Sequence, residues 1–167
     1  MPILRKRTKF SHKGTYGHLL LVGGSMGMSG AVTLAARSSY RAGVGAVSCA
    51  VPSDVQLHVA VNIPEAMVYP LSELEVLLKG KKAVVLGPGM GKNEHVLQML
   101  QYILQESTCP IVLDADALNV LAGNLELLSL AKAPVILTPH PGEMARLIGK
   151  DVKLVQNNRL ETAQKFA

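Results

Sequence analysis

The chain has 167 residues, of which 49% are hydrophobic, 17% are charged and 4% are aromatic. This composition suits one domain with a sizeable core and excludes intrinsic disorder, because so many apolar side chains need burial. Two cysteines, Cys49 and Cys109, are too few to hold a chain of this length as a disulfide scaffold. Both lie in apolar surroundings, so we expect free thiols and a reducing, cytoplasmic location.

The net charge of +5 is concentrated in the first third of the chain. Seven basic residues precede Asp54, which is the first acidic residue. This pattern indicates either an anionic partner such as phosphates or a solvated basic segment at residues 1–13. We expect no nucleic-acid partner, since no aromatic residues interleave the basic ones and no nucleic-acid-binding module is recognisable.

Residues 19–36 carry no charge and follow a basic segment, as a signal sequence or membrane anchor would. Glycines at positions 23, 24, 27 and 30 interrupt the stretch after four apolar residues. A strand, a glycine loop and a helix explain this pattern better than a membrane span does. We therefore expect no membrane association.

Short, continuously apolar runs alternate with helical patterns along the chain, as is typical of parallel strands covered on both faces. We expect strands at residues 18–22, 46–51, 66–69, 83–86, 111–114 and 135–138. We expect helices at residues 31–42, 94–106 (capped by Asn93), 142–148 and 158–167, and a short one that a Ser72/Glu75 capping box opens and Gly80 ends. The fold class is therefore α/β, with a mostly parallel sheet and helices on both faces, in a single domain over residues 1–167.

Ligands of open α/β sheets bind at the carboxyl ends of the strands, so the residues after each strand are the candidate site. Residues 23–30 (Gly-Gly-Ser-Met-Gly-Met-Ser-Gly) follow the first strand and precede an alanine-rich helix. Bare backbone and the N–H groups of a helix start can approach an anion there. The spacing is neither GxGxxG nor GxxxxGK[ST]. Tight packing of strand against helix is the alternative explanation.

A second glycine motif, residues 87–91 (Gly-Pro-Gly-Met-Gly), follows the strand at 83–86. Glycines at alternate positions let the main chain touch a flat or phosphorylated ligand. A plain turn would use the same residues.

The third motif, residues 114–119 (Asp-Ala-Asp-Ala-Leu-Asn), offers Asp114, Asp116 and Asn119 at a strand end. Carboxylates and an amide at this place could bind the waters of Mg²⁺ or ribose hydroxyls. The alternative is that Asp114 or Asp116 only caps the following helix.

The fourth motif, residues 138–143 (Thr-Pro-His-Pro-Gly-Glu), places His140 between two prolines at a strand end. Glu143 falls in the first turn of the next helix, where it would also complement the helix dipole. His140 precedes that helix, so the two side chains do not form a metal pair by helical spacing. A merely structural histidine is the alternative.

Taken in this order, five segments resemble the NAD(P)H-hydrate dehydratase family, which has a ribokinase-like fold. They are residues 12–25, 41–45, 85–91, 113–119 and 137–143, and the likeness runs from about Lys9 to the last residue. The resemblance implies a repair lyase that dehydrates hydrated NADH or NADPH at the expense of ADP or ATP, with Mg²⁺. The substrate hydroxyl would be phosphorylated and phosphate then eliminated.

The resemblance also implies roles for particular residues. Ala31, a glycine of the second motif (Gly89 or Gly91) and His140 would contact the hydrated dinucleotide. Glu143 lies where related small-molecule kinases carry an Asn-x-x-Glu motif that organises Mg²⁺ and phosphates, with His140 in place of the asparagine. Asp114, Asp116 and Asn119 are further candidates for organising Mg²⁺ and phosphates, and no residue is expected to bind the metal directly.

The chain departs from the family in one respect. Family members carry a Lys-Gly segment that contacts the nucleotide and a Gly-Ser/Thr-Gly-Asp motif whose Asp is the general base, and no Gly-x-Gly-Asp occurs in these 167 residues. Without the base and its anion hole, most of the rate of phosphoryl transfer should be lost. We therefore expect the N-terminal portion of such a dehydratase, with no catalytic residue of its own and no turnover.

Two alternatives stay open. One is a ribokinase-like kinase for a small alcohol such as a thiazole or pyrimidine. The other is a non-catalytic fragment that binds a partner chain, since an interrupted parallel sheet leaves an open edge and an apolar face. On the same ground we expect a homo-oligomer or self-association.

Overall fold

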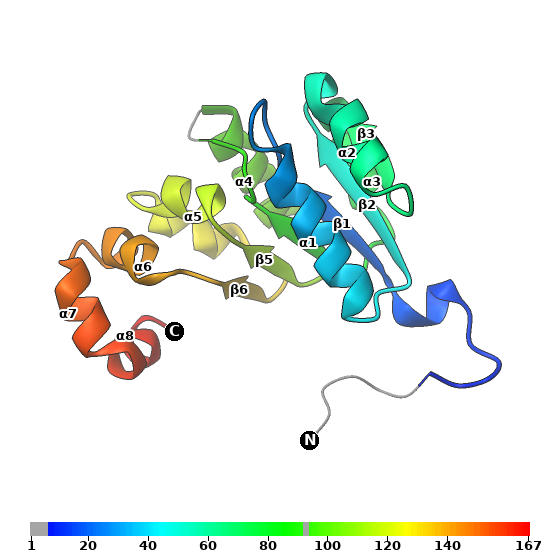
Figure 1. Ribbon diagram of the computed structural model, residues 1–167. Coiled ribbons are helices and arrows are strands. Elements are labelled where there is room, and N and C mark those ends of the chain that lie inside the picture. Colours follow the sequence, from blue (N-terminus) through cyan, green and yellow to red (C-terminus); the bar gives the residue numbers. More distant parts are fainter. Residues whose placement is uncertain (1–6, 92–93) are drawn as a thin grey trace.

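The computed structural model of the protein describes residues 7–91 and 94–167, which form a six-stranded sheet (Figure 1). Every pair of neighbouring strands in it is parallel. The strands are β1 (His18–Val22), β2 (Ala46–Val51), β3 (Met67–Pro70), β4 (Ala83–Leu86), β5 (Ile111–Leu113) and β6 (Val135–Leu137). The predicted α/β class and parallel sheet are confirmed, and no predicted strand boundary is wrong by more than one residue.

Helices cover both faces of the sheet. On one face, α1 (Ser29–Arg41) and α2 (Gln56–Asn62) pack on β1 to β3, where Val32, Ala36 and Val59 meet Leu21 and Cys49. A larger cluster lies on the other face, where buried leucines of α3 (Leu74–Leu78), α4 (Glu94–Glu106) and α5 (Asp116–Leu121) are joined by residues of α6 (Pro141–Ile148). The remaining helices are the 3₁₀ turns η1 (Lys13–Tyr16), η2 (Ser53–Val55), η3 (Leu71–Glu73) and η4 (Leu125–Leu130), and α7 (Val152–Asn157) and α8 (Arg159–Phe166).

Three details of the predicted helices are wrong or incomplete. Ser72 opens no capping box, because it lies inside η3 and α3 starts after Glu73 without a side-chain cap. Neither α2 nor α7 was predicted, since each is short and buries a single side chain. For α7 a signal existed, because Asp151 caps it by accepting a hydrogen bond from Lys153 N at 2.6 Å. The predicted cap Asn93 lies outside the described residues.

The order of the strands reverses at β1. The sheet runs β3-β2-β1-β4-β5-β6, so the chain moves outward from β1 to β3 and then returns to place β4 on the other side of β1. In open parallel sheets such a reversal leaves a crevice at the carboxyl ends, and this strand order occurs in dinucleotide-binding folds. The loops after β1 and β4 flank it here.

The uncharged stretch at residues 19–36 folds as most of β1, the glycine loop and the first two turns of α1. Within the described part of the chain, no helix is both long and apolar enough to cross a membrane.

Candidate functional site

The loops after β1 and β4 contact each other at the point of strand reversal. Gly24 N donates a hydrogen bond to Pro88 O at 2.8 Å, and Ser25 Oγ donates one to Gly89 O at 2.8 Å. A Cβ at Gly23 would lie 2.5 Å from Pro88 O. Close packing of the two loops therefore accounts for Gly23, as the structural alternative predicts.

In the second loop the glycines face different surroundings. Gly87 has φ +126°, and a Cβ there would lie 1.9 Å from Asp114 O. At Gly89 (φ +69°) a Cβ would lie 2.9 Å from the Ala31 Cβ, so the structure brings these two candidates together. Gly91 (φ +74°) has open space, since only Met28 Cε comes within 4 Å of a Cβ placed there. Of the two glycine candidates, Gly91 has the room for a ligand.

Asp116 ties the second loop to the start of α5. Its Oδ2 accepts a hydrogen bond from Gly91 N at 2.8 Å, and its Oδ1 accepts one from Asn119 Nδ2 at 3.2 Å. The buried Asn119 Oδ1 has no hydrogen-bond partner among the described residues. Oδ2 of Asp116 thus holds the loop and Oδ1 holds Asn119 of α5, whose own carbonyl oxygen is the unsatisfied acceptor beside it.

Asp114 connects the end of β5 to the end of β6. Its Oδ1 accepts a hydrogen bond from Thr138 Oγ1 at 2.9 Å. Neither Asp114 nor Asp116 caps α5, because the N-cap position is held by Ala115, so that alternative is wrong. Ala115 is the only described non-glycine residue with positive φ, at φ +48° and ψ −111°. The Asp114–Asp116 turn is therefore strained in its backbone.

His140 and Glu143 form the capping box of α6. His140 Nδ1 accepts hydrogen bonds from Gly142 N at 3.0 Å and Glu143 N at 3.4 Å, while Glu143 Oε2 accepts one from His140 N at 2.8 Å. The Glu143 side chain is buried, and that of His140 is 63% exposed. His140 thus has a structural role, as the alternative states. Its Nε2 lies 3.3 Å from Glu143 Oε1.

Hydrogen bonds connect the four motifs in series along the carboxyl edge of the sheet. Ser25 reaches the second loop, Asp116 holds that loop from the third motif, and Asp114 reaches Thr138, which opens the fourth. The Ser25 and Thr138 hydroxyls were not predicted as site residues. Their position could have identified them, because Ser25 lies in the glycine loop after the first strand and Thr138 lies directly after the last strand, before a proline. The four motifs therefore form one continuous surface.

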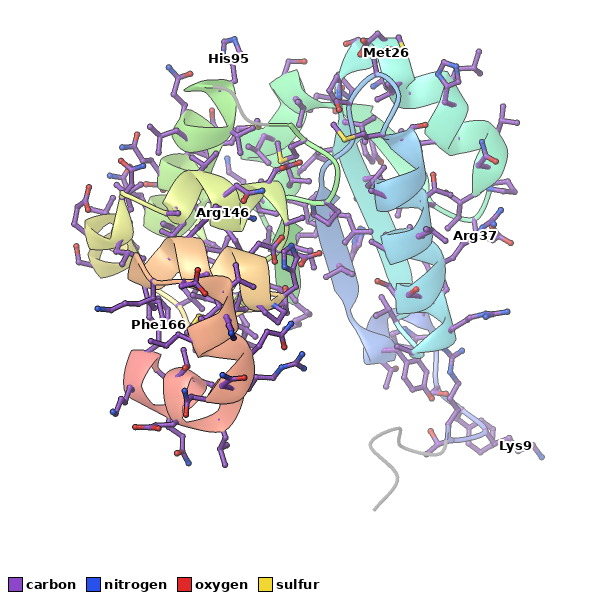
Figure 2. All side chains as sticks on the ribbon, turned by 60° about the vertical axis from the view of Figure 1, so that its left-hand side comes forward. Lys9, Met26, Arg37, His95, Arg146 and Phe166 are labelled. Atoms are coloured by element: carbon purple, nitrogen blue, oxygen red, sulfur yellow. The ribbon has the colours of Figure 1, made fainter. Side chains whose placement is uncertain are left out.

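Charge is distributed differently at the two ends of the sheet. Figure 2 shows Met26, in the first glycine loop, and Lys9, in the basic N-terminal segment, at opposite ends of the molecule. His18 at the start of β1 is close enough to Lys81 and Lys13 that their charges, after burial itself, lower its pKa. The described part of the basic segment, residues 7–13, therefore lies away from the carboxyl edge.

No three His, Cys, Asp or Glu side chains in the described ranges gather closely enough to hold a metal ion. Magnesium commonly binds through one or two carboxylates, several waters and substrate phosphates. The Asp114 and Asp116 side chains could contribute to such a shared site but do not build a cage alone. Both cysteines are free, and burial raises the pKa of the Cys49 thiol to about 12, so it is no nucleophile.

Comparison with known proteins identifies relatives for nearly the whole chain. The sequence model of the NAD(P)H-hydrate dehydratase family matches residues 19–167. The chain is 41% identical to the ADP-dependent (S)-NAD(P)H-hydrate dehydratase of Neisseria meningitidis, over 98% of this chain and 56% of the relative. It is also 41% identical to a bifunctional NAD(P)H-hydrate repair enzyme of Moorella thermoacetica, over 98% of this chain and 33% of the relative.

Solved structures agree with these relatives. The ADP/ATP-dependent NAD(P)H-hydrate dehydratase of Bacillus subtilis, crystallised with ATP and Mg²⁺, superposes with a TM-score of 0.81 at 33% identity. The match covers 98% of this chain and 58% of that one. A ribokinase-like protein of Enterococcus faecalis superposes with a TM-score of 0.84 at 22% identity, which shows the fold alone. The chain thus spans between a third and about three fifths of the proteins it matches.

Proposed function

The chain belongs to the NAD(P)H-hydrate dehydratase family, and we propose that its carboxyl edge forms part of the site that holds hydrated NADH or NADPH. The observation that carries this proposal is the series of hydrogen bonds that joins all four motifs beside the reversal of strand order. A dinucleotide is long, so it needs several loops to present backbone amides along one continuous surface.

The proposed substrate contacts are Ala31, the Gly89–Gly91 backbone and His140. Ala31 packs on Gly89, so a ligand that reaches one would pass the other. The open space at Gly91 supports backbone contact there. The His140 side chain is exposed and offers its Nε2, which lies 3.3 Å from Glu143 Oε1, two residues beyond Thr138, while Nδ1 keeps the cap of α6 intact.

Asp114, Asp116, Asn119 and Glu143 are proposed to organise phosphates and Mg²⁺. Three of them do so indirectly, by fixing neighbouring parts of the site. Asp116 fixes the Gly91 loop and Asp114 fixes Thr138. Glu143 fixes the start of α6. Bound Mg²⁺ would neutralise phosphate charge. ADP or ATP would donate a phosphoryl group to the substrate hydroxyl, and loss of phosphate with a ring proton would restore the dihydropyridine.

We further propose that the 167-residue chain is part of a single ribokinase-like domain and has no turnover by itself. It contains no Gly-x-Gly-Asp, the family's source of the general base. The test incubates the purified chain with hydrated NADH, Mg²⁺ and either ADP or ATP and follows the recovery of NADH absorbance. Recovery above the rate without protein would overturn this proposal.

Substrate binding is tested separately from turnover by thermal shift with hydrated NADH. We expect Gly91→Ala to abolish the shift, since a methyl group would fill the open space. Gly80→Ala is the matched control, because Gly80 has nearly the same φ (+71°) and open surroundings at the other end of β4. If the chain is stabilised only by thiazole or pyrimidine alcohols, the kinase alternative replaces the dehydratase. The predicted cytoplasmic location and self-association stay predictions.

A further inference from the structure

A methionine side chain from the first glycine loop lies along the second loop. Met28 is the N-cap residue of α1, and its N–H donates a hydrogen bond to Ser25 O at 2.8 Å. A Cβ placed at Gly89 would lie 2.7 Å from Met28 O and 3.2 Å from Met28 Cβ. A Cβ placed at Gly91 would lie 3.8 Å from Met28 Cε. The side chain therefore starts beside Gly89 and ends with its methyl group beside Gly91.

Met28 is thereby placed among the proposed substrate contacts, although the sequence did not single it out. Its carbonyl oxygen accepts a hydrogen bond from Ala31 N at 3.2 Å, and the Ala31 Cβ also adjoins Gly89. The end of the thioether borders the open space beside Gly91. A ligand that contacts Ala31 and fills this space therefore touches the Met28 side chain as well.

Solvent reaches this thioether. Met28 is 42% exposed, which groups it with the exposed Met26 (64%) and Met67 (37%). Met90 and Met144 are buried, and only 5% and 6% of their surface is exposed. A peroxide molecule must reach the sulfur to oxidise it, so the exposed methionines are the ones open to this reaction. Met28 thus combines exposure with contact to the second loop.

We propose that Met28 is a ligand contact of the candidate site and that its oxidation to methionine sulfoxide by hydrogen peroxide weakens dinucleotide binding. The sulfur lone pair attacks one oxygen of the peroxide, the O–O bond breaks, and the other oxygen leaves as water. The sulfur is oxidised and the peroxide is reduced. The inference rests on the proposed function, since the ligand concerned is hydrated NADH or NADPH.

Oxidation changes the chemistry of the space beside Gly91. A thioether is apolar, flexible and polarizable, and it packs well against a ring, whereas the sulfoxide carries a polar oxygen. The Gly91 N–H, which borders this space, already donates to Asp116 Oδ2 at 2.8 Å. A sulfoxide oxygen covered by the ligand would lose its hydration without gaining that donor. Burying a polar group in this way costs free energy, which lowers the affinity.

The test treats the 167-residue chain with hydrogen peroxide, removes the peroxide with catalase and locates methionine sulfoxide by mass spectrometry of peptides. Binding of hydrated NADH is then measured by calorimetry. We expect Met28 to be oxidised before Met90 and Met144, and the dissociation constant to rise about tenfold as Met28 is converted. Methionine sulfoxide reductases with a thiol reductant should restore the affinity, since they return the sulfoxide to the thioether.

Three variants identify the methionine responsible. Met28→Leu has no sulfur at this position, so its dissociation constant should be the same before and after peroxide. Met26→Leu and Met67→Leu retain Met28 and should lose as much affinity on oxidation as the parent does. Met26 is the matched control, because it lies in the same loop and is more exposed. Bound hydrated NADH should also slow the oxidation of Met28 but not that of Met67.

Several results would overturn the inference. Met28 could stay reduced while Met26 and Met67 are oxidised, or the oxidised parent could bind as tightly as before. Loss of affinity in Met28→Leu equal to that of the parent, or its absence in Met26→Leu, would assign the effect to another residue. If the unoxidised parent does not bind hydrated NADH, the proposed function fails and this inference falls with it.

Discussion

At the scale of single residues, the turn between β5 and α5 contains two candidate site residues and a strained backbone. Asp114 and Asp116 flank Ala115, whose φ of +48° and ψ of −111° match the first central position of a type II′ turn. The turn is closed by Ala117 N, which donates to Asp114 O at 3.1 Å. The two flanking carboxylates hold Thr138 and Gly91, so their contacts keep Ala115 in a conformation that glycine prefers.

We predict that Ala115→Gly stabilises the protein. Strain of this kind costs on the order of 1–3 kcal/mol, and the extra backbone entropy of glycine offsets only about 0.5–1 kcal/mol of the gain. The free energy of unfolding, measured in urea, should therefore rise by roughly 1 kcal/mol. Ala117→Gly, inside α5, is the control and should destabilise. A loss of stability in Ala115→Gly would show that the turn is unstrained.

A second prediction concerns pH. Burial first, then the charges of Lys81 and Lys13, hold the pKa of His18 below its ordinary value of 6.5. The unfolded chain therefore binds a proton at His18 more readily than the folded one. As the pH falls below 6.5, protonation of the unfolded chain lowers the free energy of unfolding. We expect His18→Gln, which can keep the hydrogen bond to Ser48, to flatten the pH dependence of the thermal midpoint between pH 7 and 5.

The exposed His58 of α2 supplies the control for this experiment. His58→Gln should leave the slope of the midpoint against pH as it is in the parent protein. An equal flattening in both variants would assign the slope to some other group.

At the scale of elements, each candidate motif also holds a helix or loop in place. The capping box of α6 shows this most directly, because the same imidazole that is proposed to face the substrate satisfies two backbone N–H groups. Pro141 at the first helical position and Gly149 in the left-handed conformation at the end (φ +62°) complete the boundaries of α6. The local sequence therefore sets where this helix begins and ends, while burial of Met144, Ala145 and Leu147 in the core stabilises it.

We predict that His140→Ala destabilises the protein by about 1 kcal/mol, the usual cost of an N-cap. His140→Asn should retain the stability, since asparagine caps equally well, but should lose any substrate contact made by Nε2. Chemical unfolding and the hydrated-NADH thermal shift, measured on both variants, separate the two roles. Equal substrate binding by His140→Asn and the parent would leave His140 with the structural role alone.

At the scale of the whole molecule, stability is distributed unevenly between the sheet and the end of the chain. All residues of β1 after His18 are buried, whereas α8 buries none and α7 buries only Val155. Segments with few buried apolar contacts open locally at low cost in free energy. The Ile136 side chain of β6 is 53% exposed, so this end of the sheet is also less protected than β1.

We predict that amide hydrogens of α8 exchange with little protection and those of β1 only through global unfolding. Native-state hydrogen exchange followed by mass spectrometry of peptides measures both. Equal protection of α8 and β1 would contradict the uneven distribution.

The strands, most helices and the four motifs are predictable from the sequence, because these depend on local periodicity, glycine, proline and capping residues. It also placed the motifs at strand ends, through the order of elements alone. The contacts of each side chain are seen only in the folded protein, where Asp116 holds Gly91, Asp114 holds Thr138, and Ala31 faces Gly89. The folded protein likewise shows that Ile136 of β6 is exposed, since coverage of a strand depends on helices distant in sequence. Such contacts join residues far apart along the chain, and no local pattern encodes their pairing.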